Sequence, residues 1–384
     1  MTHDVLTAAR ELGPSIGARS EAIEAERRLP LDIVDQMRAA GAFRMYVPDD
    51  LGGVGVSAWE SLQVIEEFAY HDAAAGWCSM IGSTTSLLAS SLPDPFAQEI
   101  FGDASTISGG FAMPVGKAVV VEGGLRVTGR WPWGSGTQHC DWIGGGCLIV
   151  DEDGNPSARG DGLIAPYVFF RAEDVSFIDT WHVMGLSGSG SCDYQVENVF
   201  VPEGRWVQIG LDEPVRSNSL SRFSIFGLLA CGVASCAVGV ARRSIDELLD
   251  LATGRRPQGS ARTLAEREST QKAIADAEAR LGSAWAFMHE AVDTAWVAAQ
   301  AGEPQTLEHR RQLRLSATHA VQTSADVGER MFKLGGGSAV YRQNRLQMTL
   351  RDVLVAGQHA LVAPSTMETC GRMRLGLDVN EKML

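Results

Sequence analysis

Residues Gly124 to Trp142 read GLRVTGRWPWGSGTQHCDW and lie where the chain changes from a helical to an alternating pattern. The segment begins directly after Ala118 to Val121 and the glycine turn at Glu122 and Gly123. Two short runs of β-formers joined by a glycine turn predict a β-hairpin. Further short apolar runs with glycine punctuation continue to about residue 210, which predicts a small β-barrel or sandwich.

Outward from this β segment, both ends of the chain have helical periodicity. The first part carries apolar residues at helical spacing up to about Phe101, with Ser57 as an expected helix cap. The last part contains four long Ala-rich segments, at 223–252, 270–301, 306–334 and 346–376, which predict an antiparallel four-helix bundle. The sequence therefore predicts an α+β, mainly α protein with three parts: an N-terminal helical domain (1–104), a central β domain (105–212) and a C-terminal bundle (213–384).

Composition restricts the classes of partner. The 384 residues include 33 Lys+Arg and 47 Asp+Glu, a net charge of −14, which disfavours nucleic acid and anionic membranes. The uncharged run from Phe223 to Ala241 is rich in Gly, Ala, Ser and Cys, which favours a packed core helix over a membrane span. No secretory signal is visible, and seven scattered cysteines without ligand spacing predict reduced thiols in the cytoplasm and no metal site.

Two other stretches carry distinctive motifs. Residues Trp181 to Ser191 read WHVMGLSGSGS and are followed by VFVP at Val199 to Pro202, and residues Leu346 to His359 read LQMTLRDVLVAGQH. Together with the Gly124 segment and the order of the three parts, they resemble the acyl-CoA dehydrogenase fold. Within that fold they are similar to the oxygenase components of two-component flavin-dependent monooxygenases. The resemblance covers nearly the whole chain.

The residues themselves suggest how a flavin is held. Alternation places Trp131, Trp133 and Ser135 on one side of the strand, where a flat aromatic ring and a hydroxyl can meet a planar tricyclic ring and its N5 edge. The loop at Gly185 to Ser191 offers many backbone N–H groups and hydroxyls, which can cradle a phosphate. Ser187 stands where many relatives carry Arg, so a charge clamp is missing from this loop.

The resemblance assigns roles to particular residues. It implies that Ser135 lies near flavin N5 and that His359 assists transfer of the oxygen atom, as the two catalytic residues. The cofactor-binding residues that it implies are Trp131, Trp133, Ser135, Gly136, Ser189, Ser191, Gly336 and Arg351. The expected substrate pocket contains Trp77, Met80, Thr84, Thr85, Phe111 and His139. Thr85 and Leu88 stand in the helix where phenol-hydroxylating relatives place a histidine, so that substrate-deprotonating step is not implied here.

One position separates two reaction classes. Acyl-CoA dehydrogenases of this fold need a carboxylate base, which in many members falls eight residues after the Asp that corresponds to Asp352. That position is Ala360, and His359 precedes it. A thioester dehydrogenase would need a displaced base, Glu368 or Glu329. A catalytically silent flavin- or ligand-binding protein is the alternative from outside enzyme chemistry.

The resemblance implies a complete activity. Reduced FMN or FAD from a separate flavin reductase reacts with O2, and the resulting C4a-hydroperoxide hydroxylates a small aromatic or heteroaromatic compound, indole-like or phenolic, or an amine. The family also implies a homotetramer. No Walker motif and no GxGxxG after a strand occurs, so no NAD(P)H site is evident.

Overall fold

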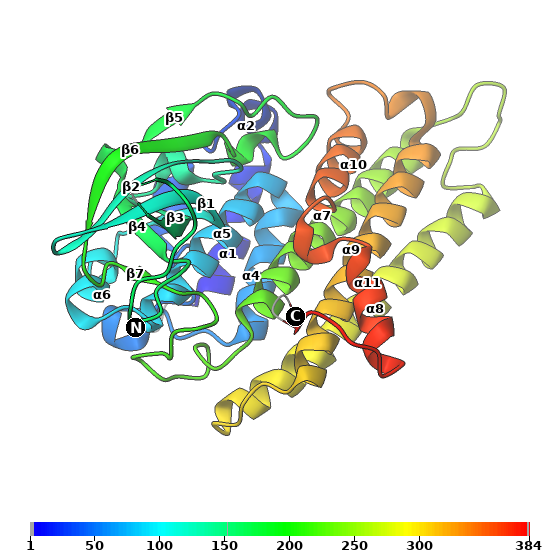
Figure 1. Cartoon of the computed structure of the whole chain (residues 1–384). Helices are drawn as coiled ribbons and strands as arrows, with labels where there is room; N and C mark the ends of the chain where they lie inside the picture. The colour runs from blue at the N-terminus through cyan, green and yellow to red at the C-terminus, as the bar shows by residue number, and fades with distance from the viewer. Residues whose placement is uncertain (1–3, 152, 382–383) are drawn as a thin grey trace.

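The computed structural model describes residues 4–151, 153–381 and 384. In Figure 1 a β-rich part with the N-terminal helices lies beside a bundle of long helices. The first helices are α1 (Val5–Gly17), α2 (Ser20–Glu26), α3 (Leu31–Ala39), α4 (Ala58–His71), α5 (Ala73–Ser86) and α6 (Asp94–Phe101). The strands are β1 (Ser108–Val121), β2 (Gly124–Trp131), β3 (Trp142–Val150), β4 (Tyr167–Arg171), β5 (Ser176–Ile178), β6 (Asp193–Pro202) and β7 (Trp206–Val207). The last helices are α7 (Ile225–Gly254), α8 (Glu268–Gln300), α9 (Leu307–Gly335), α10 (Arg345–Ala356) and α11 (Ser365–Arg374).

The predicted order of helices, strands and helices is confirmed, and so is the hairpin. In β1 and β2, Val121 pairs with Gly124 across a tight turn in which Gly123 has φ +75°. This left-handed conformation suits glycine, which has no Cβ to clash with the backbone. The seven strands form a single mixed sheet in the order β5-β6-β2-β1-β3-β4-β7, where β1 and β3 run parallel. Register irregularities between Phe111 and Gly116 in β1 bend the sheet, and two separate packed sheets are not present in the described residues.

Local capping explains where the N-terminal helices begin. Ser57 and Glu60 form a reciprocal capping box at the start of α4, as the sequence predicts for Ser57. Asp72 accepts hydrogen bonds from the backbone N–H groups of Ala74 and Ala75 and so begins α5 directly after α4 ends. The two helices are therefore joined at one residue, which fixes the direction in which α5 runs past the sheet.

Helix α7 is the central helix of the bundle and packs against α9, α4 and α10. It is long and apolar enough to cross a membrane, but 78% of its most apolar window is buried inside the protein, as expected for a core helix. Its glycines permit close approach: a Cβ at Gly239 would lie 2.3 Å from the Glu66 carbonyl oxygen. The small residues of this helix therefore serve helix packing.

The prediction of one continuous helix at 346–376 is wrong. The segment is divided into α10 and α11 by an extended residue, His359 (φ −65°, ψ 132°), and a single 3-10 turn at Ala360–Val362. Gly357 and Pro364 flank the break. Proline cannot donate the backbone hydrogen bond that a continuous helix needs, so the chain restarts at α11.

Candidate active site

The turn after β2 presents Ser135. Beyond Trp131 the chain leaves the sheet through Trp133 (φ +55°) and Gly136 (φ +69°), two left-handed residues on either side of the serine. The Ser135 N–H donates to the Trp133 carbonyl at 2.8 Å, and the Gly136 N–H donates to the Ser189 carbonyl at 2.8 Å. These bonds hold the turn against the glycine-rich loop and leave the Ser135 side chain 6% exposed.

Four side chains from three parts of the chain form a continuous hydrogen-bonded chain at this turn. The indole N–H of Trp77, on α5, donates to Ser135 Oγ at 3.0 Å. Ser135 Oγ lies 2.7 Å from Ser191 Oγ, which lies 2.7 Å from Ser189 Oγ. Ser189 Oγ in turn donates to the Leu186 carbonyl at 2.7 Å. The structure therefore brings together Ser135, Ser189, Ser191 and Trp77, all of which the sequence singles out.

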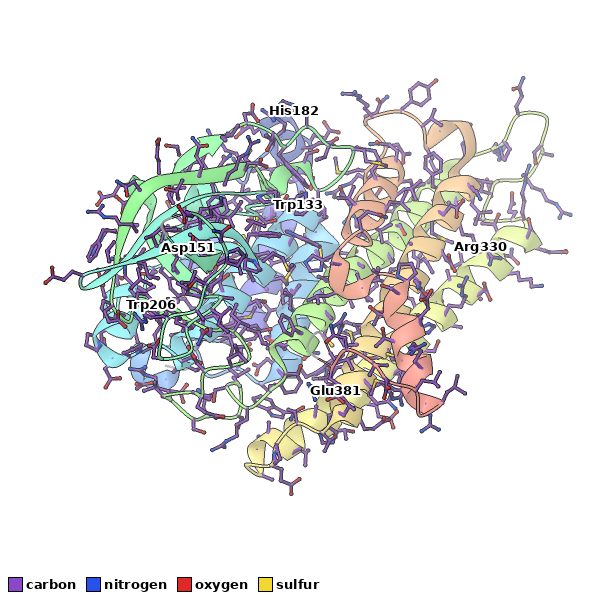
Figure 2. All side chains as sticks on the ribbon, in the orientation of Figure 1. Trp133, Asp151, His182, Trp206, Arg330 and Glu381 are labelled. Carbon is purple, nitrogen blue, oxygen red and sulfur yellow. The ribbon has the colours of Figure 1, made fainter. Side chains whose placement is uncertain are left out.

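Trp131 and Trp133 do not share a face, which corrects the sequence expectation. Trp131 is fully buried, stacks on Tyr194 with ring centroids 5.4 Å apart and donates its indole N–H to the Gly146 carbonyl. Trp133 is 60% exposed and packs on Phe111 at 5.7 Å. Figure 2 places it on the side of the sheet that faces the bundle. The left-handed backbone at Trp133 breaks strand alternation, so Trp133 is available to a ligand and Trp131 is a core residue.

His359 lies next to Trp77 because of the break between α10 and α11. Its Nδ1 accepts a hydrogen bond from the Leu361 N–H at 3.3 Å, so the neutral ring carries its proton on Nε2. Burial, with a smaller contribution from the Arg314 charge, lowers the pKa of His359 to about 4. The ring meets Trp77 edge-on with centroids 5.9 Å apart. At neutral pH His359 is therefore an uncharged hydrogen-bond donor beside the Trp77–Ser135 pair.

The other expected pocket residues have different positions. Met80 is fully buried against α7, where a Cβ at Gly232 would lie 2.7 Å from Met80 Cγ, so in this structure it packs in the core. The hydroxyls of Thr84 and Thr85 donate to backbone carbonyls one turn back in α5. His139 packs on Phe43 at 5.6 Å, and burial lowers its pKa to about 4.

Two of the expected cofactor-binding residues are engaged elsewhere within the chain. Arg351 forms an ion pair with Glu24 of α2 at 2.7 Å and donates to the Met184 carbonyl. Gly336 terminates α9 with φ +56° and begins the connection to α10. Within one chain, Arg351 therefore joins α10 to the N-terminal helices, and Gly336 is not part of the cluster around Ser135.

Asp352 and Leu186 anchor the glycine-rich loop to α10, and the sequence pattern assigned neither residue to the site. Asp352 Oδ1 accepts from the Leu186 N–H at 2.7 Å, and burial raises the pKa of this carboxyl to about 7. Leu186 has φ +52°, a strained conformation for a branched side chain. Its carbonyl accepts from Ser189 and from the Trp181 indole N–H at 3.1 Å. Through Asp352, helix α10 anchors the glycine-rich loop. The signal in the sequence that could have indicated this contact is the Arg-Asp pair within the 346–359 motif.

Carboxylates that could act as a displaced base lie outside the cluster. Glu368 is exposed on α11, and Glu329 is 55% exposed and forms an ion pair with Lys333 at 2.6 Å. Ala360 is exposed and carries no ionisable group. Among the described residues, no group of three His, Cys, Asp or Glu side chains has the arrangement of a metal site.

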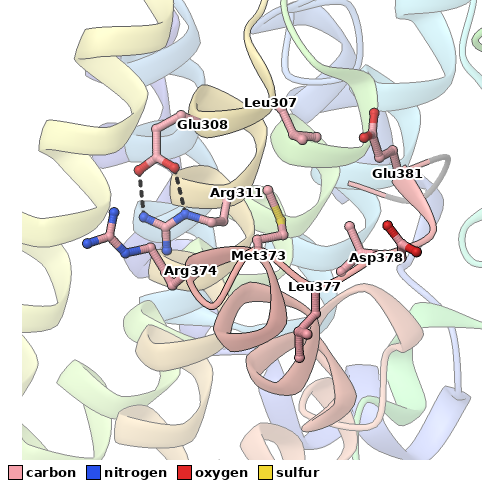
Figure 3. A pocket seen from close by; sticks show the side chains of 9 residues that line it. Leu307, Glu308, Arg311, Met373, Arg374, Leu377, Asp378 and Glu381 are labelled. Atoms are coloured by element: carbon pink, nitrogen blue, oxygen red, sulfur yellow. Dashed lines mark hydrogen bonds and ion pairs between the residues drawn. The ribbon is translucent and has the colours of Figure 1, made fainter.

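A cavity of about 400 Å³ lies between the start of α9 and the C-terminal segment (Figure 3). Its lining contains none of the residues predicted for the site: it is formed by Leu307, Glu308, Arg311, Met373, Arg374, Leu377, Asp378, Val379 and Glu381. Arg311 is paired with Glu308, with Nε and Oε2 2.7 Å apart. This cavity is therefore a separate feature of the bundle.

The Ser135 cluster fits a flavin ring edge. One lone pair of Ser135 Oγ accepts from Trp77, and the hydroxyl retains a second lone pair. An exposed, flat Trp133 ring and a glycine at position 136 lie beside it. Neutral His359 contacts the same Trp77 ring, with centroids 5.9 Å apart.

Comparison with known proteins identifies the family of the chain. Residues 7–93 match the N-terminal domain model of acyl-CoA dehydrogenases, and residues 231–364 match a C-terminal domain model of the same family. The chain is 32% identical to the indole-3-acetate monooxygenase of Pseudomonas putida, over 94% of this chain and 90% of that protein. It is 27% identical to the flavin-dependent monooxygenase oxygenase subunit HsaA of Mycobacterium tuberculosis, over 99% of this chain and 97% of that protein.

Among solved structures, XiaF from Streptomyces sp. in complex with FADH2 and glycerol superposes with a TM-score of 0.91. At 23% identity, with 98% of this chain and 96% of that chain covered, it establishes the shared fold. The domain matches, the shared fold and the full-length monooxygenase relatives have one explanation: the chain belongs to the flavin-dependent monooxygenases of the acyl-CoA dehydrogenase fold.

Proposed function

We propose that this protein is the oxygenase component of a two-component flavin-dependent monooxygenase. It takes reduced FMN or FAD from a separate flavin reductase and inserts one oxygen atom of O2 into a small aromatic or heteroaromatic compound. Indole-like, phenolic and amine substrates are the classes that the site chemistry suits. Hydroxylation is the proposed outcome.

The observation that carries the proposal is the position of Trp77. Its indole N–H donates to Ser135 Oγ, and its ring contacts the His359 ring at a steep angle. A hydroxyl and a neutral imidazole donor therefore both contact one rigid aromatic side chain. No carboxylate takes part in this group, in contrast to the base that a thioester dehydrogenase needs.

Each residue has a defined task in this proposal. Trp133 covers the ring system of the flavin, and Ser135 Oγ bonds at its N5 edge. His359 donates its Nε2 hydrogen toward the oxygen that is transferred. Reduced flavin, when bound at these residues, would supply the chemistry that activates O2.

The substrate class is supported by the relatives and by the aromatic side chains of the site. The Pseudomonas putida relative is named for indole-3-acetate, and Phe111 and the exposed Trp133, which pack on each other, offer apolar aromatic surface to a bicyclic ring. The homotetramer and the cytoplasmic location implied by the family remain part of the proposal. Neither a nucleic acid nor a membrane is required by this function.

Stopped-flow mixing tests the proposal. The protein is mixed anaerobically with reduced FMN or FAD and then with O2, while the absorbance of a C4a-hydroperoxide is followed. We expect the C4a-hydroperoxide to form. When indole-3-acetate or a simple phenol is added, we expect hydroxylated product. If reduced flavin instead oxidises at the rate seen without protein, the proposed function is wrong.

A further inference from the structure

The hydrogen-bonded chain at Ser135 has a defined direction. Ser189 Oγ lies 2.7 Å from the Leu186 carbonyl oxygen, which can only accept, so the single hydroxyl hydrogen of Ser189 is used there. Ser191 must then donate to Ser189, and Ser135 must donate to Ser191. The direction therefore runs from the Trp77 N–H through three hydroxyls to one carbonyl.

The opposite direction is unfavourable because of the Leu186 carbonyl. Reversal would make Ser189 donate to Ser191, and two oxygen lone pairs would then face one another across the 2.7 Å contact. Leu186 itself cannot move away, since Asp352 holds its N–H and Trp181 donates to its carbonyl. The chain is also dry: Ser189 is 1% exposed and Ser191 is 2% exposed.

This direction determines which hydrogen bonds Ser135 can still form. Its hydrogen is directed inward to Ser191 and one lone pair receives the Trp77 N–H, so the second lone pair is its one remaining bonding position. Toward a ligand, Ser135 can accept a hydrogen bond and cannot donate one. Reduced flavin carries a hydrogen on N5, whereas the N5 of oxidised flavin is itself an acceptor.

We propose that Ser189 and Ser191 are positioning residues that hold the Ser135 hydroxyl as an acceptor and thereby make the site selective for reduced over oxidised flavin. The inference rests on the proposed function, because it places N5 at Ser135. It gives the site a means of releasing the spent flavin, since the N5 hydrogen that Ser135 accepts is absent from the oxidised product.

Binding measurements test this without turnover. The dissociation constants of reduced flavin, under anaerobic conditions, and of oxidised flavin are measured for the same protein, and their ratio is compared between variants. In Ser191→Ala the Ser135 hydrogen loses its acceptor and can turn toward the flavin. In Ser189→Ala, Ser191 can donate to Ser135 and reverse the direction. Both variants are expected to reduce the preference for reduced flavin by roughly three- to tenfold.

Two further variants are the controls. Ser189→Thr keeps the hydroxyl and is expected to retain the wild-type ratio. Ser79→Ala removes another buried hydroxyl of the same part of the protein, which donates to the Ala42 carbonyl at 2.7 Å, and is expected to leave the ratio unchanged. Circular dichroism and melting temperature establish that each variant is folded.

The outcomes separate the two proposals. If both alanine variants weaken the two flavin forms equally, the serines have only a structural role and the inference is wrong. If the wild type prefers reduced flavin but Ser189→Ala and Ser191→Ala keep that preference, the inference alone fails. If the wild type binds neither form, the proposed function fails, and the inference with it.

Discussion

The indole N–H of Trp77 donates to the hydroxyl of Ser135 at 3.0 Å, across 58 residues of sequence. This bond joins α5 of the N-terminal helices to the turn that follows β2. Because Trp77 also contacts His359, one side chain positions two groups that come from the sheet and from the bundle. The candidate site exists only where these three parts of the fold meet.

Ser135→Ala is expected to shorten the lifetime of the oxygenated flavin and to divert oxygen to hydrogen peroxide. The Ser135 oxygen is a weak base that accepts the N5 hydrogen and keeps water from it. A lost hydrogen bond of ~1–3 kcal/mol corresponds to roughly a fivefold to hundredfold faster decay. Stopped-flow absorbance and the ratio of peroxide to product measure the effect. If the variant forms as much product per reduced flavin consumed as the wild type does, the assignment of Ser135 to the site is wrong.

His359→Asn is expected to slow formation of the oxygenated flavin or oxygen transfer while the fold is retained. The pKa of His359 is about 4, so its neutral donor form persists from pH 6 to 9 and the rate should show no histidine titration there. The lowered pKa also determines how the free energy of unfolding changes with pH. Between pH 6.5 and 4 the unfolded chain binds a proton that the folded chain does not, so the free energy of unfolding falls as pH falls.

His139 has a similarly lowered pKa, so the wild type loses stability from both histidines in that window. Urea titrations at pH 7 and pH 4.5 should show a smaller loss for His359→Asn than for the wild type. An equal loss would contradict the buried, neutral state of His359.

Asp352→Asn is expected to increase stability at alkaline pH. Burial raises the pKa of the Asp352 carboxyl to about 7 from an ordinary value of 3.8, so the folded chain holds a proton there that the unfolded chain has lost. Stability therefore falls as pH rises from about 4 to about 7. Asparagine keeps the oxygen that accepts from Leu186, and the variant's advantage should be largest at pH 8 and vanish near pH 4 in thermal melts. If the variant instead lost stability above pH 7 and not at low pH, the charged carboxylate would be the favourable form and the raised pKa would be contradicted.

Trp131 and Trp133 should behave differently when substituted. Trp131→Ala removes a fully buried ring and is expected to cost ~3–5 kcal/mol of unfolding free energy. Trp133→Gly removes an exposed ring and relieves a left-handed backbone, so the melting temperature should change little while flavin affinity falls. Equal destabilisation by both changes would contradict these positions.

No dehydrogenase activity on saturated acyl-CoA substrates is expected with an artificial electron acceptor. Ala360 has no base, and the carboxylates of Glu368 and Glu329 are exposed on other helices. Robust reduction of the acceptor would contradict this, and Glu368→Gln and Glu329→Gln would then identify the base.

The sequence predicted those features that depend on local pattern. The glycine turn before Gly124, the cap at Ser57 and the apolar periodicity of the last helices each arise from residues close together in the chain. The motif at 181–191 singled out Ser189 and Ser191, because hydroxyls and glycines in one loop indicate backbone and side-chain donors. The structure joins both serines to Ser135, and their role toward a flavin stays a prediction.

Tertiary structure decided which of these residues meet. Strand alternation predicted that Trp131 and Trp133 share one face of the strand, whereas the left-handed backbone at Trp133 separates the two side chains. Such a backbone conformation is stable only when surrounding contacts hold it. The break at His359 has local signals in Gly357 and Pro364, whereas the contact of His359 with Trp77 exists only in the folded chain. By itself the sequence determined the elements and the residue types of the site. The direction of the serine chain and the neutral state of His359 depend on burial and on partners distant in sequence, which only the folded chain provides.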